Sequence, residues 1–381
     1  MFRLSVVGVL CGCVLFAQTG DPPSPEHYLQ DALALHQKGD FAGAITEYRA
    51  YLKLRPDAID ARSNLGAALA QLGRYEEAIT EYRRALEKHP ANPGVTLNLG
   101  LAYYKSGQFA EAAHEFTAAR ALAPDHKQAV LLLADCRLRL GEYKDVIALL
   151  TPLEKTSKDD LAIVYMLGTA LVRDQQPERG QVLIDRILKN GDSAEARLLL
   201  GTTKMMASDY AGARSDLERA VELNPKLPDV YSYYGMALVR TGDGAGAAEA
   251  FRKGLEANPY DFNANLELGT LLRQDEKLDP ALAHFERALR SRPGDPGARF
   301  QIASVHLSTG KTEQARTELE QLIKESPEFT EAHVTLATVY YRLKRKADGD
   351  RERAIVQKLT AERQAKEPGV AASGGPSKNS Q

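Results

Sequence analysis

Histidines, cysteines and paired carboxylates are the residues of this chain that could hold a metal ion or take part in catalysis. The eight histidines are scattered, and none has a metal-ligand motif around it. The sequence contains no phosphate loop and no nucleophile elbow, and the Glu76-Glu77 pair belongs to a solvated helix face. We therefore predict that the chain is not an enzyme and uses no metal or other cofactor. The histidines are His27, His36, His89, His114, His126, His284, His306 and His333.

Regularly spaced basic residues are the second group that could carry chemistry. Lys105, Arg139, Arg173, Arg240 and Arg342 recur at steps close to multiples of 34 residues. Side by side on one surface, they could capture an acidic segment or a terminal carboxylate. They also end predicted helices, where a cation gains about 0.3–1 kcal/mol from the helix dipole. The sequence leaves both interpretations open.

The elements that would position these residues follow a repeat of 34 residues. A small residue recurs at this step, except for one step of 33 between Gly168 and Gly201, and a proline follows most of them. A period in this range is typical of helix-turn-helix units that stack into a solenoid. The small residues are Ala32, Gly66, Gly100, Ala134, Gly168, Gly201, Gly235, Gly269, Ala303 and Ala337.

Other positions recur in phase with the small residue. Gly73 ends the first helix of its unit, Ala78 lets two helices approach, and Tyr82 is expected to fill the space beneath the next unit. This arrangement closely resembles the tetratricopeptide repeat over roughly residues 25–329, although the tryptophan that the family favours at position 4 is missing. The resemblance implies an all-α superhelical solenoid of about nine to ten helix-turn-helix repeats with a C-terminal capping helix.

We expect the solenoid to span residues 25–349, followed by a capping helix at 350–366 and a disordered tail at 367–381. The fourth and fifth units match the pattern weakly. We interpret them as continued solenoid with altered curvature, and a hinge near 152–160 is the alternative. The units are expected near 25–58, 59–92, 93–126, 127–160, 161–193, 194–227, 228–261, 262–295 and 296–329, with a partial unit at 330–349.

The resemblance also implies a binding surface, because the first helices of this family line the concave face. The inward positions are apolar in the middle units, which suits an extended peptide or an amphipathic helix. Tight winding that partly buries these residues is the alternative. The predicted protein-binding residues are Leu97, Leu101, Tyr104, Lys105, Leu131, Arg139, Tyr165, Arg173, Met206, Met236, Arg240 and Phe300.

The first residues have the layout of a secretory signal peptide. Arg3 precedes an apolar run that ends at Ala17, and we expect cleavage there, with a linker at 18–24. Two alternatives are lipid attachment at Cys13 and a buried first helix of a cytoplasmic protein. Once a leader of 17 residues is removed, Cys136 is the one cysteine left, and we interpret it as a small buried hydrophobe in an alanine position.

Composition narrows the class of partner. Basic and acidic residues nearly balance, 49 against 51, so no global charge favours nucleic acid or an anionic membrane. We predict an exported, periplasmic or secreted scaffold that binds a protein or peptide during envelope assembly or secretion. The alternatives are an accessory subunit of an envelope peptidase or glycosyl-modifying enzyme, and a cytoplasmic adaptor. Membrane attachment is expected only if Cys13 is lipidated, and the oligomeric state stays open.

Overall fold

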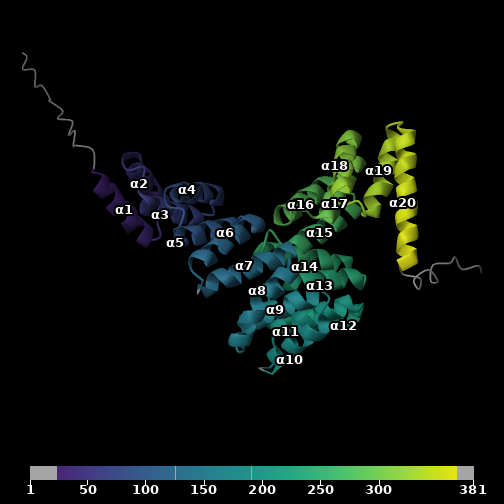
Figure 1. The fold of residues 1–381 in the computed structure, drawn as a ribbon, viewed down its shortest axis with the longest axis horizontal. Helices are drawn as coiled ribbons and strands as arrows, with labels where there is room; N and C mark the ends of the chain where they lie inside the picture. The colour runs from purple at the N-terminus through teal and green to yellow at the C-terminus, as the bar shows by residue number, and fades with distance from the viewer. Residues whose placement is uncertain (1–23, 125, 190, 367–381) are drawn as a thin grey trace, which may run out of the picture. The chain divides into compact units, whose positions relative to one another are not determined.

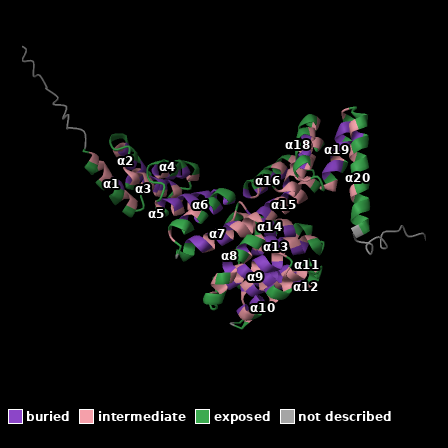
Figure 2. Ribbon diagram, viewed as in Figure 1, coloured by how far each residue is buried: buried purple, intermediate pink, exposed green. Residues whose placement is uncertain are grey.

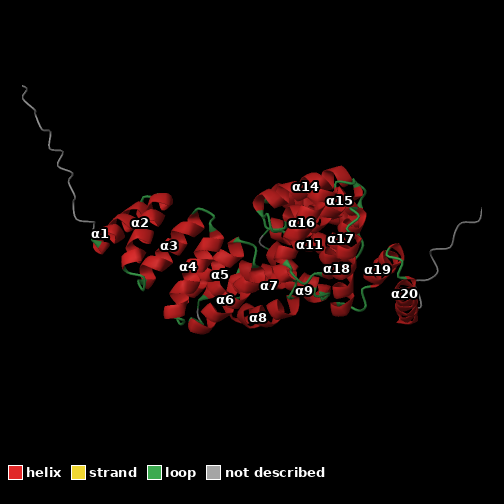
Figure 3. Cartoon of the chain, turned by 90° about the horizontal axis from the view of Figure 1, so that it is seen from above, coloured by secondary structure: helices red, strands yellow, loops and turns green. Residues whose placement is uncertain are grey.

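The computed structural model describes residues 24–124, 126–189 and 191–366 (Figure 1). These residues form twenty helices, and no strand occurs among them (Figure 3). The predicted signal peptide at 1–17 with Cys13, nearly all of the 18–24 linker and the tail at 367–381 lie outside the described residues. The part of the chain that is described is therefore the all-α structure that the 34-residue period predicts.

The chain divides into two compact units, which we describe separately. Unit 1 ends at Pro90 and contains two helix pairs, in which each helix contacts the next along the chain. Its buried core includes Ala44, Tyr48, Ala78 and Tyr82, all from the second helix of a pair. Its helices are α1 (Pro25–Gln37), α2 (Phe41–Leu54), α3 (Ile59–Gln71) and α4 (Tyr75–Lys88).

Unit 2 begins at Ala91 and continues the same helix pairs in chain order. From α7 onward, the first helices of successive pairs also contact each other, and we call the surface that the first helices form the inner face. The helices of unit 2 are α5 (Pro93–Lys105), α6 (Phe109–Leu122), α7 (Lys127–Leu140), α8 (Tyr143–Thr156), α9 (Leu161–Arg173), α10 (Pro177–Leu188), α11 (Ala194–Met206), α12 (Tyr210–Leu223), α13 (Val230–Arg240), α14 (Gly244–Ala257), α15 (Phe262–Gln274), α16 (Leu278–Ser291), α17 (Pro296–Ser308), α18 (Thr312–Glu325), α19 (Thr330–Arg342) and α20 (Lys346–Lys366).

Local sequence signals account for where many of these helices begin and turn. Asp243, Asp261 and Asp295 each accept a hydrogen bond from the backbone N–H three residues later, as N-cap residues do. The turn inside each pair needs a residue with positive φ, and Gly107 supplies it in the third unit. Where glycine is absent, other residues adopt the same conformation, so the repeat imposes it. These residues are Gln175, Ser208, Glu276 and Lys344.

The aromatic position of the repeat contacts the small residue of its own unit in addition to the next unit. The ring of Tyr82 lies against Gly66 of its own unit. Phe116 lies against Gly100 in the same way. Phe251 and Phe285, at the same repeat position, belong to buried clusters that include residues of the next unit, as the sequence predicts. The small residue and the aromatic residue are therefore two halves of one contact between the helices of a pair.

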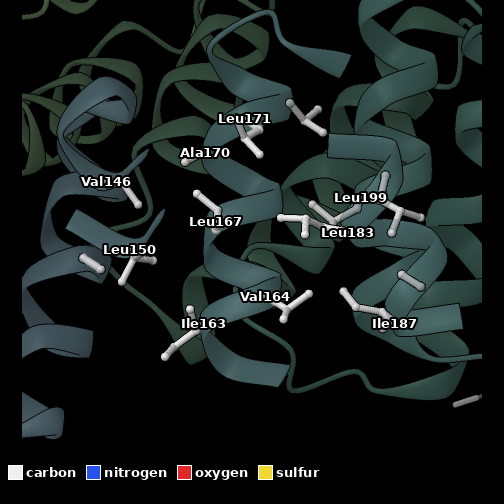
Figure 4. Packing of buried hydrophobic residues seen from close by; sticks show 14 of the residues in the cluster. Val146, Leu150, Ile163, Val164, Leu167, Ala170, Leu171, Leu183, Ile187 and Leu199 are labelled. Carbon is white, nitrogen blue, oxygen red and sulfur yellow. The ribbon is translucent and has the colours of Figure 1, made fainter. Parts of the chain in front are cut away.

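The fourth and fifth units share one hydrophobic core (Figure 4). Val146 and Leu150 of α8 belong to the same buried cluster as Leu167 of α9 and Ile187 of α10. Helix α8 also continues through Pro152 to Thr156, across the start of the segment named as an alternative hinge. Aliphatic residues here take the places of the repeat's alanines and aromatics, which explains why the pattern is weak. This continuous core favours the continued solenoid.

The winding of unit 2 brings residues far apart in sequence into contact. Arg292 Nε donates a hydrogen bond of 2.5 Å to the carbonyl oxygen of Arg139, 153 positions earlier. The ring of Tyr260 packs against Gly107 so closely that a Cβ at this position would overlap the ring. The turns at the ends of α5 and α7 therefore meet those that follow α14 and α16.

The last helix begins earlier than the predicted capping helix at 350–366. Helix α20 starts at Lys346 and packs along α19, where His333 Nδ1 lies 2.6 Å from Glu352 Oε2. Most of its other residues are exposed (Figure 2), as a terminal repeat requires. Among the helices of the described residues, none combines the length and hydropathy needed to cross a membrane.

Candidate functional site

The inner face of unit 2 encloses a cavity that we call the inner cavity. Side chains from the first helices α7, α9 and α11 form one part of its wall, and residues around the starts of α6, α13 and α15 and the end of α16 form the rest. It leaves about 90 Å³ of open space for the centres of water-sized molecules. The charged residues that line it are Asp135, Arg139, Arg173, Asp229, Asp261 and Arg292.

Arg139 is held by an acidic and aromatic cluster and is not a free cation. Its Nε lies 2.8 Å from Asp135 Oδ2, which also accepts a 2.5 Å hydrogen bond from the Tyr104 hydroxyl. The guanidinium lies over the rings of Tyr104 and Phe109. Burial opposes its charge, but Asp135 and its other neighbours raise the pKa of Arg139 well above the usual value. Burial, followed by the Asp135 charge, also raises the pKa of Tyr104.

Arg173 lies one unit further along, and no carboxylate of the described residues lies within 4.0 Å of its guanidinium nitrogens. Its guanidinium lies 4.3 Å from the ring centre of Tyr233 and 5.9 Å from that of Tyr143. Its Nε is buried and makes no hydrogen bond. Burial works against the charge, yet the nearby Tyr233, Tyr143 and Asp229 keep the pKa of Arg173 raised. The side chain is thus a charged group whose donor capacity is not filled.

Asp229 stands at the start of α13 in an unusual backbone conformation. Its φ of 64° is left-handed, which costs energy in a residue other than glycine. Its side chain does not cap the helix, and no other hydrogen bond or ion pair of this carboxylate occurs within the described residues. Its charge nevertheless acts on two neighbouring tyrosines. Burial raises the pKa of Tyr165 most, and the charge of Asp229 raises it further. Burial also raises the pKa of Tyr233 most, Arg173 lowers it, and the charge of Asp229 raises it. The carboxylate therefore lies among the side chains of the cavity.

Asp261 is the second carboxylate on this side of the cavity. It accepts hydrogen bonds of 2.6 Å from the Ser232 hydroxyl and 2.9 Å from the backbone N–H of Ala264. Burial, followed by the charge of Asp229, raises its pKa to about 6. Unlike Asp229, this carboxylate is committed to the fold.

Arg292 closes the cavity from the end of α16. Besides its hydrogen bond to the Arg139 carbonyl, its guanidinium lies 4.1 Å from the ring centre of Phe262. The neighbouring Ser291 hydroxyl donates a 2.5 Å hydrogen bond to the carbonyl oxygen of Tyr260. These contacts hold the two distant parts of the inner face together.

The structure brings three of the twelve predicted binding residues to the cavity wall: Arg139, Tyr165 and Arg173. The predicted basic row does not form a free surface, because Arg139 and Arg173 are enclosed and Arg240 lies over the Tyr210 ring. Lys105, Arg240 and Met206 are exposed. The remaining residues are partly buried along the first helices and are Leu97, Leu101, Tyr104, Leu131, Met236 and Phe300.

Four charged residues of the cavity are absent from the sequence prediction: Asp135, Asp229, Asp261 and Arg292. Asp261 occupies an N-cap position, which indicates a structural role. The Pro228-Asp229 pair is a local signal, since proline interrupts the start of that unit's first helix. Arg292 carries no such signal, because it reaches the site through the winding of the solenoid.

Cys136 is fully buried, as expected for a residue in an alanine position, and burial raises the pKa of its thiol. Within the described part of the chain, no group of three or more His, Cys, Asp or Glu residues is placed to hold a metal ion.

Comparison with known proteins identifies the repeat. A profile described as TPR repeat matches residues 32–73 and 68–107. Two profiles described as tetratricopeptide repeat match residues 97–150, 165–228 and 234–296, and residues 272–333. One similar solved structure, titled "Crystal structure of MamA", is 18% identical with a TM-score of 0.39, and the match covers 44% of this chain and 97% of that one. No curated protein matches the chain.

Proposed function

The chain belongs to the tetratricopeptide repeat family, and we propose that it is a non-enzymatic scaffold that binds a protein or peptide on the inner face of unit 2. Repeats of this family generally mediate contacts between proteins. The inner face of a solenoid is an extended surface, which suits an extended or helical segment of a partner.

The observation that carries this proposal is a set of partly exposed apolar side chains on the first helices. Leu97 and Leu101 of α5, Met236 of α13 and Phe300 of α17 retain accessible surface, although the opposite sides of these helices pack into the core. Met206 at the end of α11 is 44% exposed. Apolar surface of this kind gains free energy when a partner covers it, and methionine side chains adapt to partners of different shape.

We further propose that the scaffold works outside the cytoplasm, in envelope assembly or secretion. The apolar run that ends at Ala17 supports this proposal, because its length and flanks are those of a signal peptide. N-terminal sequencing of the protein from its native host tests it. We expect the mature chain to begin near Gln18, or at a lipid-modified Cys13 if the protein is a lipoprotein. An intact Met1 would contradict export by this signal.

Site-specific photocrosslinking tests the binding surface. A photoreactive residue at Leu101 or Met236 should capture a defined partner in the native host, and excess purified wild-type protein should compete for it. The control position is Val182 on α10, which is 61% exposed but lies on a second helix. Capture from position 182 alone would show that the inner face is not the binding surface.

A further inference from the structure

We propose that the inner cavity binds a small zwitterion of the free α-amino-acid class, with its carboxylate on Arg173 and its ammonium group on Asp229. This proposal goes beyond the scaffold function, because the ligand is a small molecule inside the cavity and not a protein on the inner face. The purified protein alone is enough to test it.

Arg173 supplies the anion-binding half of the site. It lines the cavity, and no carboxylate of the described residues lies within 4.0 Å of it. A buried Nε–H without an acceptor costs roughly 1–3 kcal/mol, more for a charged group. The planar guanidinium suits a carboxylate, which can accept two parallel hydrogen bonds from it. The rings of Tyr233 and Tyr143 restrict its movement, so the group is already positioned for a ligand.

Asp229 supplies the cation-binding half. Its equivalent one unit later is Asn263, which lies inside helix α15, whereas Asp229 precedes α13 with a positive φ. Strained backbone that brings an uncommitted charge into a cavity is a feature of functional sites. In the part of the chain that the structure describes, neither a helix cap nor an ion pair uses this carboxylate.

The other charged groups of the cavity already have hydrogen-bond partners. Asp135 pairs with Arg139, Asp261 accepts from Ser232 and Ala264, and Arg292 donates to a backbone carbonyl. Three arginines and three aspartates line the cavity, so the wall is formally neutral. A simple anion would leave Asp229 unpaired, and a simple cation would leave Arg173 unpaired. A ligand that carries both charges leaves neither group unpaired, and burying an unpaired charge is costly.

The size of the cavity fits a ligand of this class. A single water molecule needs about 10–15 Å³ of open space for its centre. The 90 Å³ of open space in the cavity therefore holds several non-hydrogen atoms. Met166, Val172 and Leu198 add apolar surface to the wall, on which a small side chain could pack. A dipeptide carries the same two charges further apart, so it is the second source of this chemistry.

Isothermal titration calorimetry of the full-length protein tests the proposal. The probes are the single free amino acids, a set of dipeptides, acetate alone and methylammonium alone. We expect at least one amino acid or dipeptide to bind, and acetate and methylammonium each to bind at least about tenfold more weakly. Dipeptides that bind more tightly than single amino acids would identify the longer zwitterion as the ligand. Failure of every amino acid and dipeptide to bind at millimolar concentration would overturn the proposal.

Two substitutions locate the binding groups. Asp229→Asn removes the charge but tolerates the left-handed backbone, and Arg173→Gln removes the guanidinium. Each should weaken binding by about tenfold or more, because a charged hydrogen bond contributes roughly 1.5–3 kcal/mol. The matched controls are Asp209→Asn, an exposed N-cap, and Arg240→Gln, at the same repeat position as Arg173 but exposed. Neither control should change the affinity.

The Asn variant keeps the proposal falsifiable if Arg173→Gln does not fold. Asp229 makes no capping hydrogen bond, so its substitution removes none from the fold. Ligand affinity that is unchanged in a folded Asp229→Asn protein would overturn the assignment, as would acetate binding that equals amino-acid binding.

Discussion

Phe116 packs against Gly100 so closely that no side chain fits between the two helices. A Cβ at Gly100 would lie 2.6 Å from Cε1 of the ring, which is closer than real Cβ contacts come. Glycine inside a helix costs about 0.5–1 kcal/mol relative to alanine, so this contact must offset that cost. The same glycine–aromatic contact occurs between Gly66 and Tyr82, Gly235 and Phe251, and Gly269 and Phe285.

Gly100→Leu should therefore lower the free energy of unfolding by roughly 1–3 kcal/mol, because the added side chain overpacks the helix pair. Urea denaturation followed by circular dichroism measures the effect. Gly244→Ala is the control, because a Cβ at that exposed helix start meets no atom within 4 Å. That substitution should change stability by no more than about 0.5 kcal/mol. Equal midpoints for both variants and the wild type would show that Gly100 is not at a close contact.

The helices and their pairing were predictable because each repeat encodes its own contact. Gly100 and Phe116 are close in sequence, and the same spacing recurs in other units, so the 34-residue phase identifies both. The last helix was predicted less well, with a start at 350 where the structure has Lys346. The charged segment after α19 lacks the repeat pattern, so nothing in phase marked its first turn.

The inner cavity was predictable only in part, for two physical reasons. Arg139, Tyr165 and Arg173 follow from the repeat, since they occupy inward positions of first helices. Arg292 meets Arg139 across 153 positions, and that contact depends on rotations that accumulate over several units. The position of Asp229 could not be predicted from the repeat, because this unit departs from the pattern: Pro228 precedes Asp229, and α13 starts late in its unit.

Tyr104→Phe should destabilise unit 2, because it removes the hydroxyl that donates a 2.5 Å hydrogen bond to Asp135. A hydrogen bond to a charged group contributes about 1.5–3 kcal/mol, and this one also positions the partner of Arg139. Urea denaturation measures the loss. Tyr341→Phe is the control, because its hydroxyl bonds the exposed Asp350. An effect of Tyr104→Phe no larger than that of the control would mean that the buried cluster does not depend on this hydrogen bond.

Arg292→Ala should loosen the contact between the α7–α8 and α16–α17 turns while unit 2 remains folded. The side chain supplies both the hydrogen bond to the Arg139 carbonyl and the contact with Phe262. Hydrogen exchange followed by mass spectrometry should show exchange faster by about tenfold or more in peptides covering 139–143 and 291–295. Arg287→Ala, an exposed change on the same helix, should leave both peptides unchanged. If the hydrogen exchange rates of these peptides in Arg292→Ala equal those of the wild type, other contacts hold the turns together.

Asp261 should make the stability of unit 2 depend on pH. Burial and then the charge of Asp229 raise its pKa from 3.8 to about 6, so the folded protein binds a proton more tightly than the unfolded chain does. Its contribution to stability is therefore fully present below pH 4 and is lost as the pH rises through about 6. Asp261→Asn keeps a capping side chain and removes the titration, so the stability of this variant relative to wild type should increase between pH 4 and pH 7.

Asp160→Asn provides the opposite comparison for this prediction. Hydrogen bonding to Lys127 lowers the pKa of Asp160, so its contribution is present above the unfolded pKa of 3.8 and is lost only as the pH falls further. The stability difference between Asp160→Asn and wild type should therefore stay constant from pH 5 to pH 7. Thermal unfolding of both variants and the wild type across this pH range measures the two trends. If the Asp261→Asn difference is also constant between pH 4 and pH 7, burial and the charge of Asp229 do not raise the pKa of Asp261 in the folded protein.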